Sequence, residues 1–142
     1  ITDAGLVGIV IGVSPHFSVL QLLLNRDTRV SSKVQRSRVD GIIEWEGETF
    51  LVLKNVPRSL DVQAGDAILT STYSAKYPAN IVVGRVTQVS EEANSLFRRV
   101  VVEPAVNFAT LEQLFVVDAK PNPERTEIER KISDRLRLRT TP

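Results

Sequence analysis

Short runs of β-branched and apolar residues, separated by turn signals, fill the first 118 residues. Clusters such as Ser14-Pro15 and Asn25-Arg26-Asp27 interrupt the runs. Before Ala119, apolar residues follow helical spacing for no more than one turn, at residues 110–114. The pattern predicts an all-β body of small barrels or a sandwich. Its expected strands are residues 6–13, 17–24, 29–35, 41–45, 49–56, 67–71, 81–89, 97–103 and 113–117.

One sequence pattern occurs twice in this body. Residues 8–14 and 84–90 both read Gly-x-Val-x-x-Val-Ser, and a turn followed by another expected strand precedes the second copy. Repeated strands opened by glycine indicate two related β units, so we predict two small β-barrel subdomains side by side. A side chain at either opening glycine would disturb the backbone, through a positive φ or through close approach of a neighbouring strand. The residues assigned structural roles are Gly8, Gly65, Asp66 and Gly84.

The pattern changes after Asp118. Pro121 and Pro123 interrupt any strand, and charged residues dominate positions 124–139. Ile128, Ile132 and Leu136 form only a thin stripe at a spacing of four residues, which buries little surface on a helix. We therefore expect residues 119–142 to be a disordered charged tail, with a docked helix as the alternative.

Composition and charge exclude several classes of protein. With 42% hydrophobic and 25% charged residues, the 142-residue chain has the composition of a soluble globular protein. The absence of cysteine excludes disulfides, thiolate zinc sites and thiol nucleophiles. Seven basic and four acidic residues lie from Lys120 onward, against eleven and thirteen before it, so no basic surface for nucleic acid is expected. The start at Ile1 rather than methionine indicates a fragment.

Serine hydrolase chemistry is the most specific enzymatic alternative. His16, an aspartate such as Asp40 or Asp66, and Ser71 follow the residue order of one protease class, and two barrels are superficially trypsin-like. The nucleophile would need oxyanion donors, usually from glycine-rich backbone, and Ser71-Thr72-Tyr73 contains no glycine. We therefore expect a turn histidine and a strand-ending serine, and no catalytic residue.

Other sites have weaker signals. One histidine and scattered carboxylates do not form a metal-ligand pattern, and no glycine-rich phosphate loop opens a helix. Glu44, Glu46 and Glu48 alternate as on an exposed hairpin tip, which favours a solvated face over a catalytic pair. The sequence predicts neither a metal nor a cofactor.

Two tyrosines offer a candidate partner-binding surface. Tyr73 and Tyr77 lie in a segment between two expected strands, and tyrosine combines apolar area with a hydrogen-bonding tip. The alternative is that both rings pack against the end of a barrel.

Several motifs follow one another in order along residues 5–117. They are Gly5–Ser14, Val34–Ser37 with Gly41–Ile43, Asn55–Pro57, Val62–Ser71, Tyr77-Pro78, Val83–Val86 and Val102–Ala105. Taken jointly, these motifs resemble the extracytoplasmic β region of the bacterial rod-shape-determining protein family MreC. The family pattern usually has glycine where Thr72 and Asn80 stand here.

The resemblance implies a two-barrel ectodomain without catalytic activity. Residues 5–45 and 96–118 would form a discontinuous first barrel, residues 46–95 an inserted second barrel, and residues 119–142 the tail. The family acts as a scaffold and regulator of the cell-elongation machinery that makes peptidoglycan. Its members contact the elongation transpeptidase, penicillin-binding protein 2, and other membrane proteins of that machinery, and they self-associate.

The resemblance also implies a location on the extracytoplasmic (periplasmic) face of the bacterial inner membrane. Family members are single-pass membrane proteins whose spanning helix and coiled coil would precede Ile1. Two other functions stay open from the residues alone, a serine hydrolase on a two-barrel frame and a β module that binds a cell-wall ligand.

Overall fold

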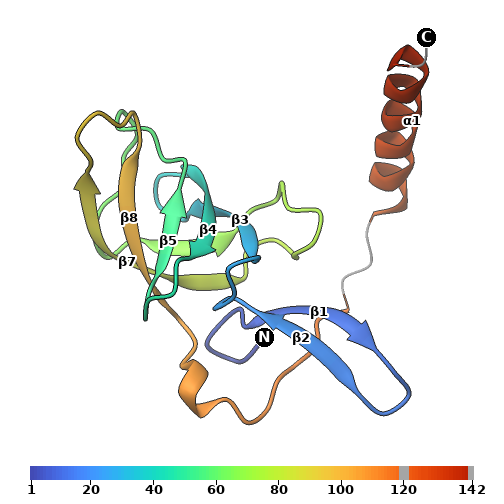
Figure 1. Ribbon diagram of the computed structural model, residues 1–142, viewed down its shortest axis with the longest axis horizontal. Helices are drawn as coiled ribbons and strands as arrows, with labels where there is room; N and C mark the ends of the chain where they lie inside the picture. The colour runs from blue at the N-terminus through green and yellow to red at the C-terminus, as the bar shows by residue number, and fades with distance from the viewer. Residues whose placement is uncertain (119–121, 141–142) are drawn as a thin grey trace.

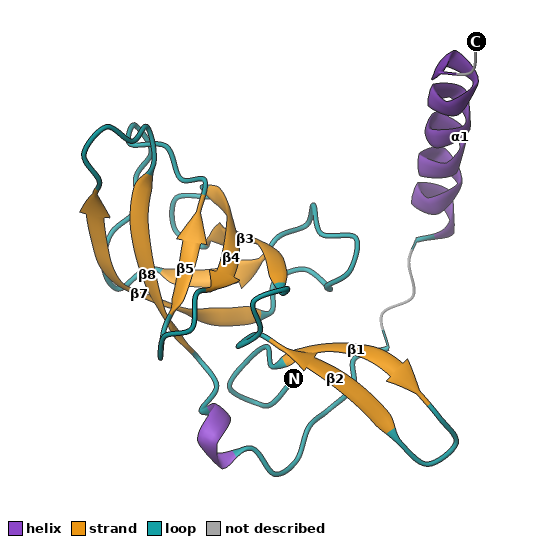
Figure 2. Cartoon of the chain, viewed as in Figure 1, coloured by secondary structure: helices purple, strands orange, loops and turns teal. Residues whose placement is uncertain are grey.

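A computed structural model describes residues 1–118 and 122–140, in which six strands form a closed barrel and two more form a separate sheet (Figure 1). Neighbouring barrel strands are antiparallel and follow the order β3-β4-β5-β8-β7-β6. Strands supply most of the regular structure of residues 1–118 (Figure 2). The barrel strands are β3 (Arg29–Val34), β4 (Asp40–Trp45), β5 (Leu51–Lys54), β6 (Ala67–Thr70), β7 (Val82–Glu91) and β8 (Arg98–Pro104).

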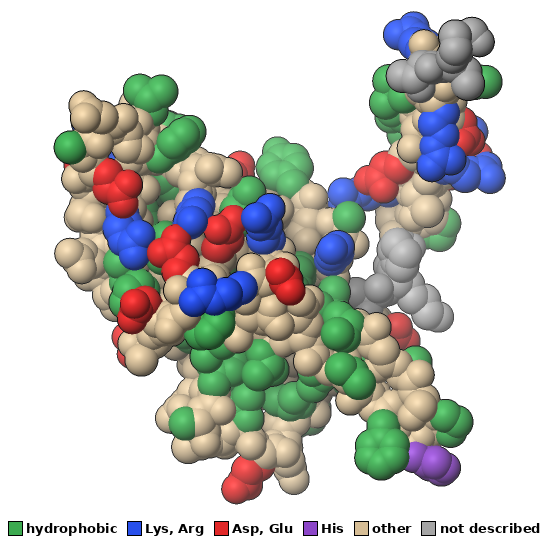
Figure 3. Space-filling view, in the orientation of Figure 1, with side chains coloured by type: hydrophobic (Ala, Val, Ile, Leu, Met, Phe, Trp, Pro, Cys, Tyr) green, Lys and Arg blue, Asp and Glu red, His purple; other side chains and the backbone are tan. Residues whose placement is uncertain are grey.

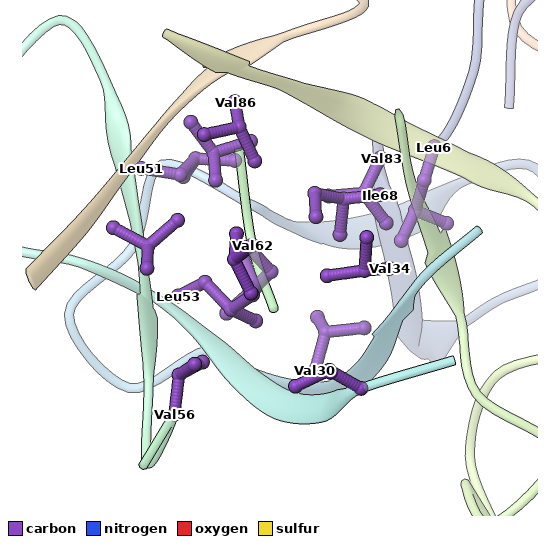
Figure 4. Packing of buried hydrophobic residues seen from close by; sticks show 14 of the residues in the cluster. Leu6, Val30, Val34, Leu51, Leu53, Val56, Val62, Ile68, Val83 and Val86 are labelled. Atoms are coloured by element: carbon purple, nitrogen blue, oxygen red, sulfur yellow. The ribbon is translucent and has the colours of Figure 1, made fainter. Parts of the chain in front are cut away.

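The barrel interior is filled by valine, leucine and isoleucine from all six strands. Figure 4 shows labelled side chains such as Leu51, Val86 and Ile68 pointing toward one another from different strands. Alternation explains the arrangement, because successive side chains of a strand point to opposite faces. The largest of these buried side chains are Val30, Val34, Ile43, Leu51, Leu53, Ile68, Val83, Val86, Val100 and Val102.

Two register shifts and one close backbone approach accompany the closure of the barrel. Shifts interrupt the β6–β7 ladder between Ile68 and Leu69 and the β7–β8 ladder between Val86 and Gln88. Such irregularities bend a strand and increase its twist, as a small barrel requires. At Gly84, a Cβ atom would lie 2.1 Å from the carbonyl oxygen of Glu103 on β8. Glycine therefore allows β7 to approach β8 closely.

The second sheet is the hairpin of β1 (Gly8–Val13) and β2 (Ser18–Leu22). It joins the barrel through buried Leu6, whose amide donates to the carbonyl of Val82 at 2.8 Å. A Cβ atom at Gly8 would lie 2.1 Å from the carbonyl oxygen of Gln21. Both glycines that open the repeated pattern thus lie where a neighbouring strand leaves no room for a side chain.

The all-β fold class and a closed barrel are confirmed, but the strands pair differently from the expected boundaries. Strands β3, β4 and β8 come from the segments assigned to the first barrel, and they close one barrel together with β5–β7. The expected division at residues 45/46 falls in a hairpin, where Trp45 pairs with Leu51 across a short turn. Strands β4 and β5 are therefore neighbours in the same barrel. Residues 113–117, expected to be a strand, have no regular secondary structure.

The prediction of a disordered tail is wrong for residues 123–140, which form a helix, α1 (Pro123–Thr140). Residues 119–121 and 141–142 of the expected tail lie outside the described residues. Local interactions explain the helix: the Asn122 side chain accepts from the Glu124 amide at its start. Ion pairs one turn apart join Arg125 to Glu129 at 2.8 Å and Lys131 to Glu127 at 2.9 Å. Neither this helix nor the short η1 (Phe108–Thr110), the two helices of the described residues, has the length and apolar character needed to span a membrane.

Candidate partner-binding surface

The loop between β6 and β7 is held at its base by side chain–backbone hydrogen bonds. The Thr70 hydroxyl donates to the carbonyl of Pro78 at 2.6 Å and accepts from the amide of Ile81 at 2.9 Å. Asn80 has φ 65°, a left-handed conformation that asparagine tolerates better than most residues other than glycine. Asparagine at position 80 is therefore compatible with the conformation of this loop.

The two tyrosines of this loop have different environments. Tyr73 is 76% exposed, whereas Tyr77 is 7% exposed and belongs to the core cluster. Burial also raises the pKa of the Tyr77 phenol. The loop therefore presents one aromatic side chain to solvent and uses the other for packing. Sequence spacing could not separate them, because both residues lie in a segment without regular periodicity.

An apolar cavity of about 200 Å³ lies where the hairpin meets the barrel loop. The residues that line it include Tyr77 and Pro78 of the loop, and Leu6 and Leu20 before and within the hairpin. The segment 114–117 contributes further apolar side chains. There the amide and carbonyl of Phe115 form hydrogen bonds with Ile1, both at 2.8 Å. Packing of Tyr77 therefore connects the loop to the second sheet.

Sequence analysis missed a group of exposed apolar side chains around the second sheet. Phe17 lies in the turn of the hairpin and is 78% exposed, close to the exposure of Tyr73. In Figure 3 the single histidine, His16, marks this tip in purple beside hydrophobic side chains. Contiguous exposed apolar surface often marks an interaction site. Others in the group are Ile11, Val13 and Val19 of the hairpin, and Phe115 and Val116 of the segment 114–117.

The turn before β6 is fixed by an ionic network. The Arg36 guanidinium donates to both carboxylate oxygens of Asp66, at 2.8 and 3.0 Å, and to Asp61 at 2.6 Å. Asp66 is buried, and the hydrogen bonds from Arg36 hold the pKa of its carboxyl below the usual range. Gly65 has φ 93°, where a side chain would be strained. Gly65 and Asp66 thus have local structural roles in this turn.

Glu44 and Glu46 belong to an ion-pair ladder on the barrel surface. Lys54 contacts Glu46 at 2.7 Å and Glu44 at 3.3 Å, and Arg99 contacts Glu46 at 3.3 Å. The hydrogen bond from Lys54 lowers the pKa of Glu46, which keeps that carboxylate ionised. Among residues 1–118 and 122–140, no three histidine or acidic side chains are grouped to hold a metal ion.

The residues considered for serine hydrolase chemistry are not arranged as a triad. His16 is exposed in the hairpin turn, whereas Ser71 is buried at the end of β6. The Ser71 hydroxyl accepts from the amide of Tyr73 at 3.1 Å. Of the two candidate acids, Asp66 is engaged by Arg36 and Asp40 lies in β4. The geometry therefore gives the hydrolase alternative no support.

Comparison with known proteins matches residues 1–118 to the family model described as rod shape-determining protein MreC, barrel core. Among curated relatives, the cell shape-determining protein MreC of Listeria monocytogenes is 28% identical over 138 residues, covering 94% of this chain. The MreC of Haemophilus influenzae is 32% identical over 115 residues, covering 80% of this chain.

A solved structure described as MreC superimposes with a TM-score of 0.72 at 25% identity, covering 76% of this chain and 62% of that one. The chain spans 47% and 32% of the lengths of the two curated relatives. The family model covers the whole β body, and the fold agrees with it. This chain therefore belongs to the rod shape-determining protein MreC family, of which its residues 1–118 form the barrel core.

Proposed function

We propose that this chain is a non-enzymatic scaffold of the bacterial cell-elongation machinery, acting through protein–protein contacts on the extracytoplasmic side of the inner membrane. The observation that carries the proposal is the family match over residues 1–118, which includes the barrel, the hairpin and the loop of Tyr73. The curated relatives from Listeria monocytogenes and Haemophilus influenzae are cell shape-determining proteins. The location is supported by a solved relative, 27% identical with a TM-score of 0.63, described as the major periplasmic domain of the cell shape-determining filament MreC.

The proposed partner is the elongation transpeptidase, penicillin-binding protein 2. A solved complex joins penicillin-binding protein 2 to MreC from Helicobacter pylori, and that MreC has the fold of this chain at 21% identity and a TM-score of 0.58. A scaffold acts through surface contacts, and aromatic side chains often carry much of the binding energy at such contacts. The other solved relative is a cell shape-determining filament, which supports self-association as a second property of this chain.

We place the contact with the transpeptidase at the loop of Tyr73. Its ring is mostly exposed on a loop whose base is fixed by Thr70, so little conformational entropy is lost when a partner covers it. Tyr77 contributes indirectly, because its buried ring supports the loop from below. The formal net charge of the chain is only +1. Electrostatic steering of the partner is therefore weak, and apolar anchors should supply most of the affinity.

The test is biosensor binding of the full chain to the ectodomain of the cognate transpeptidase. We expect reversible binding that Tyr73→Ala weakens by roughly 10-fold or more, as is usual for an aromatic anchor. Phe17→Ala is the matched control, since Phe17 is equally exposed but lies on the hairpin. Absence of binding by the parent chain at high micromolar concentration refutes the partner. Loss of binding in Phe17→Ala but not in Tyr73→Ala moves the contact to the hairpin.

A further inference from the structure

We propose that the C-terminal half of α1 binds the surface of anionic phospholipid bilayers, a property separate from the proposed scaffold contacts. Every side chain of residues 123–139 is exposed. The start of the helix contacts the β6–β7 loop, where Arg125 donates to the carbonyl of Thr72 at 3.4 Å, but Figure 1 shows the remainder of the helix standing away from the barrel. A helix without a buried face gains little from its own protein. Its side chains are therefore available to another surface.

The charge of α1 is divided unevenly along its length. In the N-terminal half, Arg125 pairs with Glu129, and Glu127 pairs with Lys131. Residues 130–139 contain five basic residues and only one acidic residue, Asp134. Within the described part of the chain, the side chains of Arg130, Arg135 and Arg139 form no ion pair. Figure 3 shows basic side chains gathered along this helix.

Apolar and basic side chains share one face of this half. Positions 132, 135, 136 and 139 are separated by three, four and seven residues, so they lie on the same side of a helix. Ile132, Arg135, Leu136, Leu138 and Arg139 indeed line one shallow hollow. Ile132 is 53% exposed and Leu138 is 77% exposed.

This mixture of apolar and basic side chains fits a lipid surface better than it fits a second copy of the chain or a nucleic acid. Long arginine stems let guanidinium groups reach lipid phosphates while isoleucine and leucine enter the boundary of the acyl chains. Pairing with a second copy through the same face would bring Arg135 and Arg139 into an apolar seam, which is costly without acidic partners. A nucleic acid would leave the exposed apolar side chains without contacts. An anionic bilayer accommodates both kinds of side chain.

Attraction to such a bilayer is local to the helix. The residues before Lys120 carry eleven basic and thirteen acidic side chains, so the body has no excess positive charge. Each arginine or lysine close to an anionic surface strengthens binding by about fivefold, and the effect decreases within a Debye length. Arg135 and Arg139, the two arginines on the face shared with Ile132 and Leu136, should thus together strengthen binding by about 25-fold.

The experiment is flotation of the full chain with vesicles of phosphatidylcholine alone or mixed with phosphatidylglycerol. We expect binding only to the mixed vesicles, decreasing as salt is raised. Arg135→Gln/Arg139→Gln should weaken this binding by about 25-fold. Arg125→Gln/Lys131→Gln is the matched control, because it removes the same charge from ion-paired positions, and it should weaken binding by no more than about fivefold.

Circular dichroism should show that both double variants keep their helix. The proposal is overturned if the parent chain does not float with the mixed vesicles, or if both double variants bind equally. Ile132→Gln/Leu136→Gln tests the apolar contribution, and unchanged binding would refute insertion of these side chains. Sedimentation supplies a last check: a dimer that this variant dissociates, without vesicle binding by the parent, would identify a second copy as the occupant instead.

Discussion

Gly84→Ala is the smallest change that tests the close approach of β7 and β8. The added Cβ atom would lie 2.1 Å from the carbonyl oxygen of Glu103 and 2.9 Å from a methyl of Val102. A real Cβ contact is hardly ever shorter than 3.0 Å, so β7 and β8 must separate locally. Overpacking of this kind costs about 1–3 kcal/mol, and each weakened ladder hydrogen bond adds roughly 1 kcal/mol.

Alanine also restricts the unfolded chain, which offsets up to about 1 kcal/mol of that cost. We therefore expect Gly84→Ala to lower the free energy of unfolding by about 2–3 kcal/mol, and the melting temperature by roughly 10 °C. Urea denaturation followed by circular dichroism measures the first quantity, and a thermal scan measures the second.

Gly12→Ala provides the matched control for this substitution. Gly12 also lies in a strand, but its added Cβ atom would meet only the Val19 Cβ at 3.9 Å, an ordinary contact. The melting temperature of the Gly12→Ala variant should stay within about 2 °C of that of the parent, or rise slightly. Equal melting temperatures for Gly84→Ala and Gly12→Ala would show that the close approach relaxes at little cost, and the argument for glycine at the repeated position would fail.

Three further outcomes are expected. Removal of residues 119–142 should leave the melting temperature of the body nearly unchanged, because α1 is exposed; a drop of many degrees would reveal docking. Asp66→Asn should lower stability at pH 7 by about 1–3 kcal/mol, measured by urea midpoints. Since the pKa of Asp66 is depressed, its contribution exists above the unfolded-state pKa of about 3.9 and is lost as pH falls through the folded-state value. The variant should therefore lose less stability than the parent on acidification, and equal losses would contradict the ion-pair argument. A serine-directed fluorophosphonate should not label the chain, and stoichiometric labelling of Ser71 that His16→Ala abolishes would restore the hydrolase alternative.

The positions of the strands were predictable from sequence because their signals are local. Valine-rich alternation and turn residues located all eight strands of the described residues. Strand pairing was not predictable in the same way, because β5 pairs with β8 across a large separation in sequence. The repeated glycine pattern indicated two units but carried no information about which strands close the barrel.

The candidate surface was predictable only in part. The loop was located by its two tyrosines, but burial of Tyr77 depends on the hairpin and on segment 114–117, which meet it only in the folded chain. The exposed hairpin was missed because its apolar residues resemble those of a buried strand. The helix of the tail was not predicted because its apolar stripe alone is a weak helical signal. Its local ion pairs and the Asn122 cap stabilise the helix instead.

The barrel closes where its first and last strands in the order, β3 and β6, pair with each other. This ladder is among the shortest in the barrel. Strands β3 and β6 pair through only three positions, Ser32 with Thr70, Lys33 with Leu69 and Val34 with Ile68. Until these pairs form, a folding chain presents two unpaired edges that can recruit strands from another molecule. A chain in which only this seam is still open therefore offers two edges of its barrel sheet to aggregation, and its closure removes both at once.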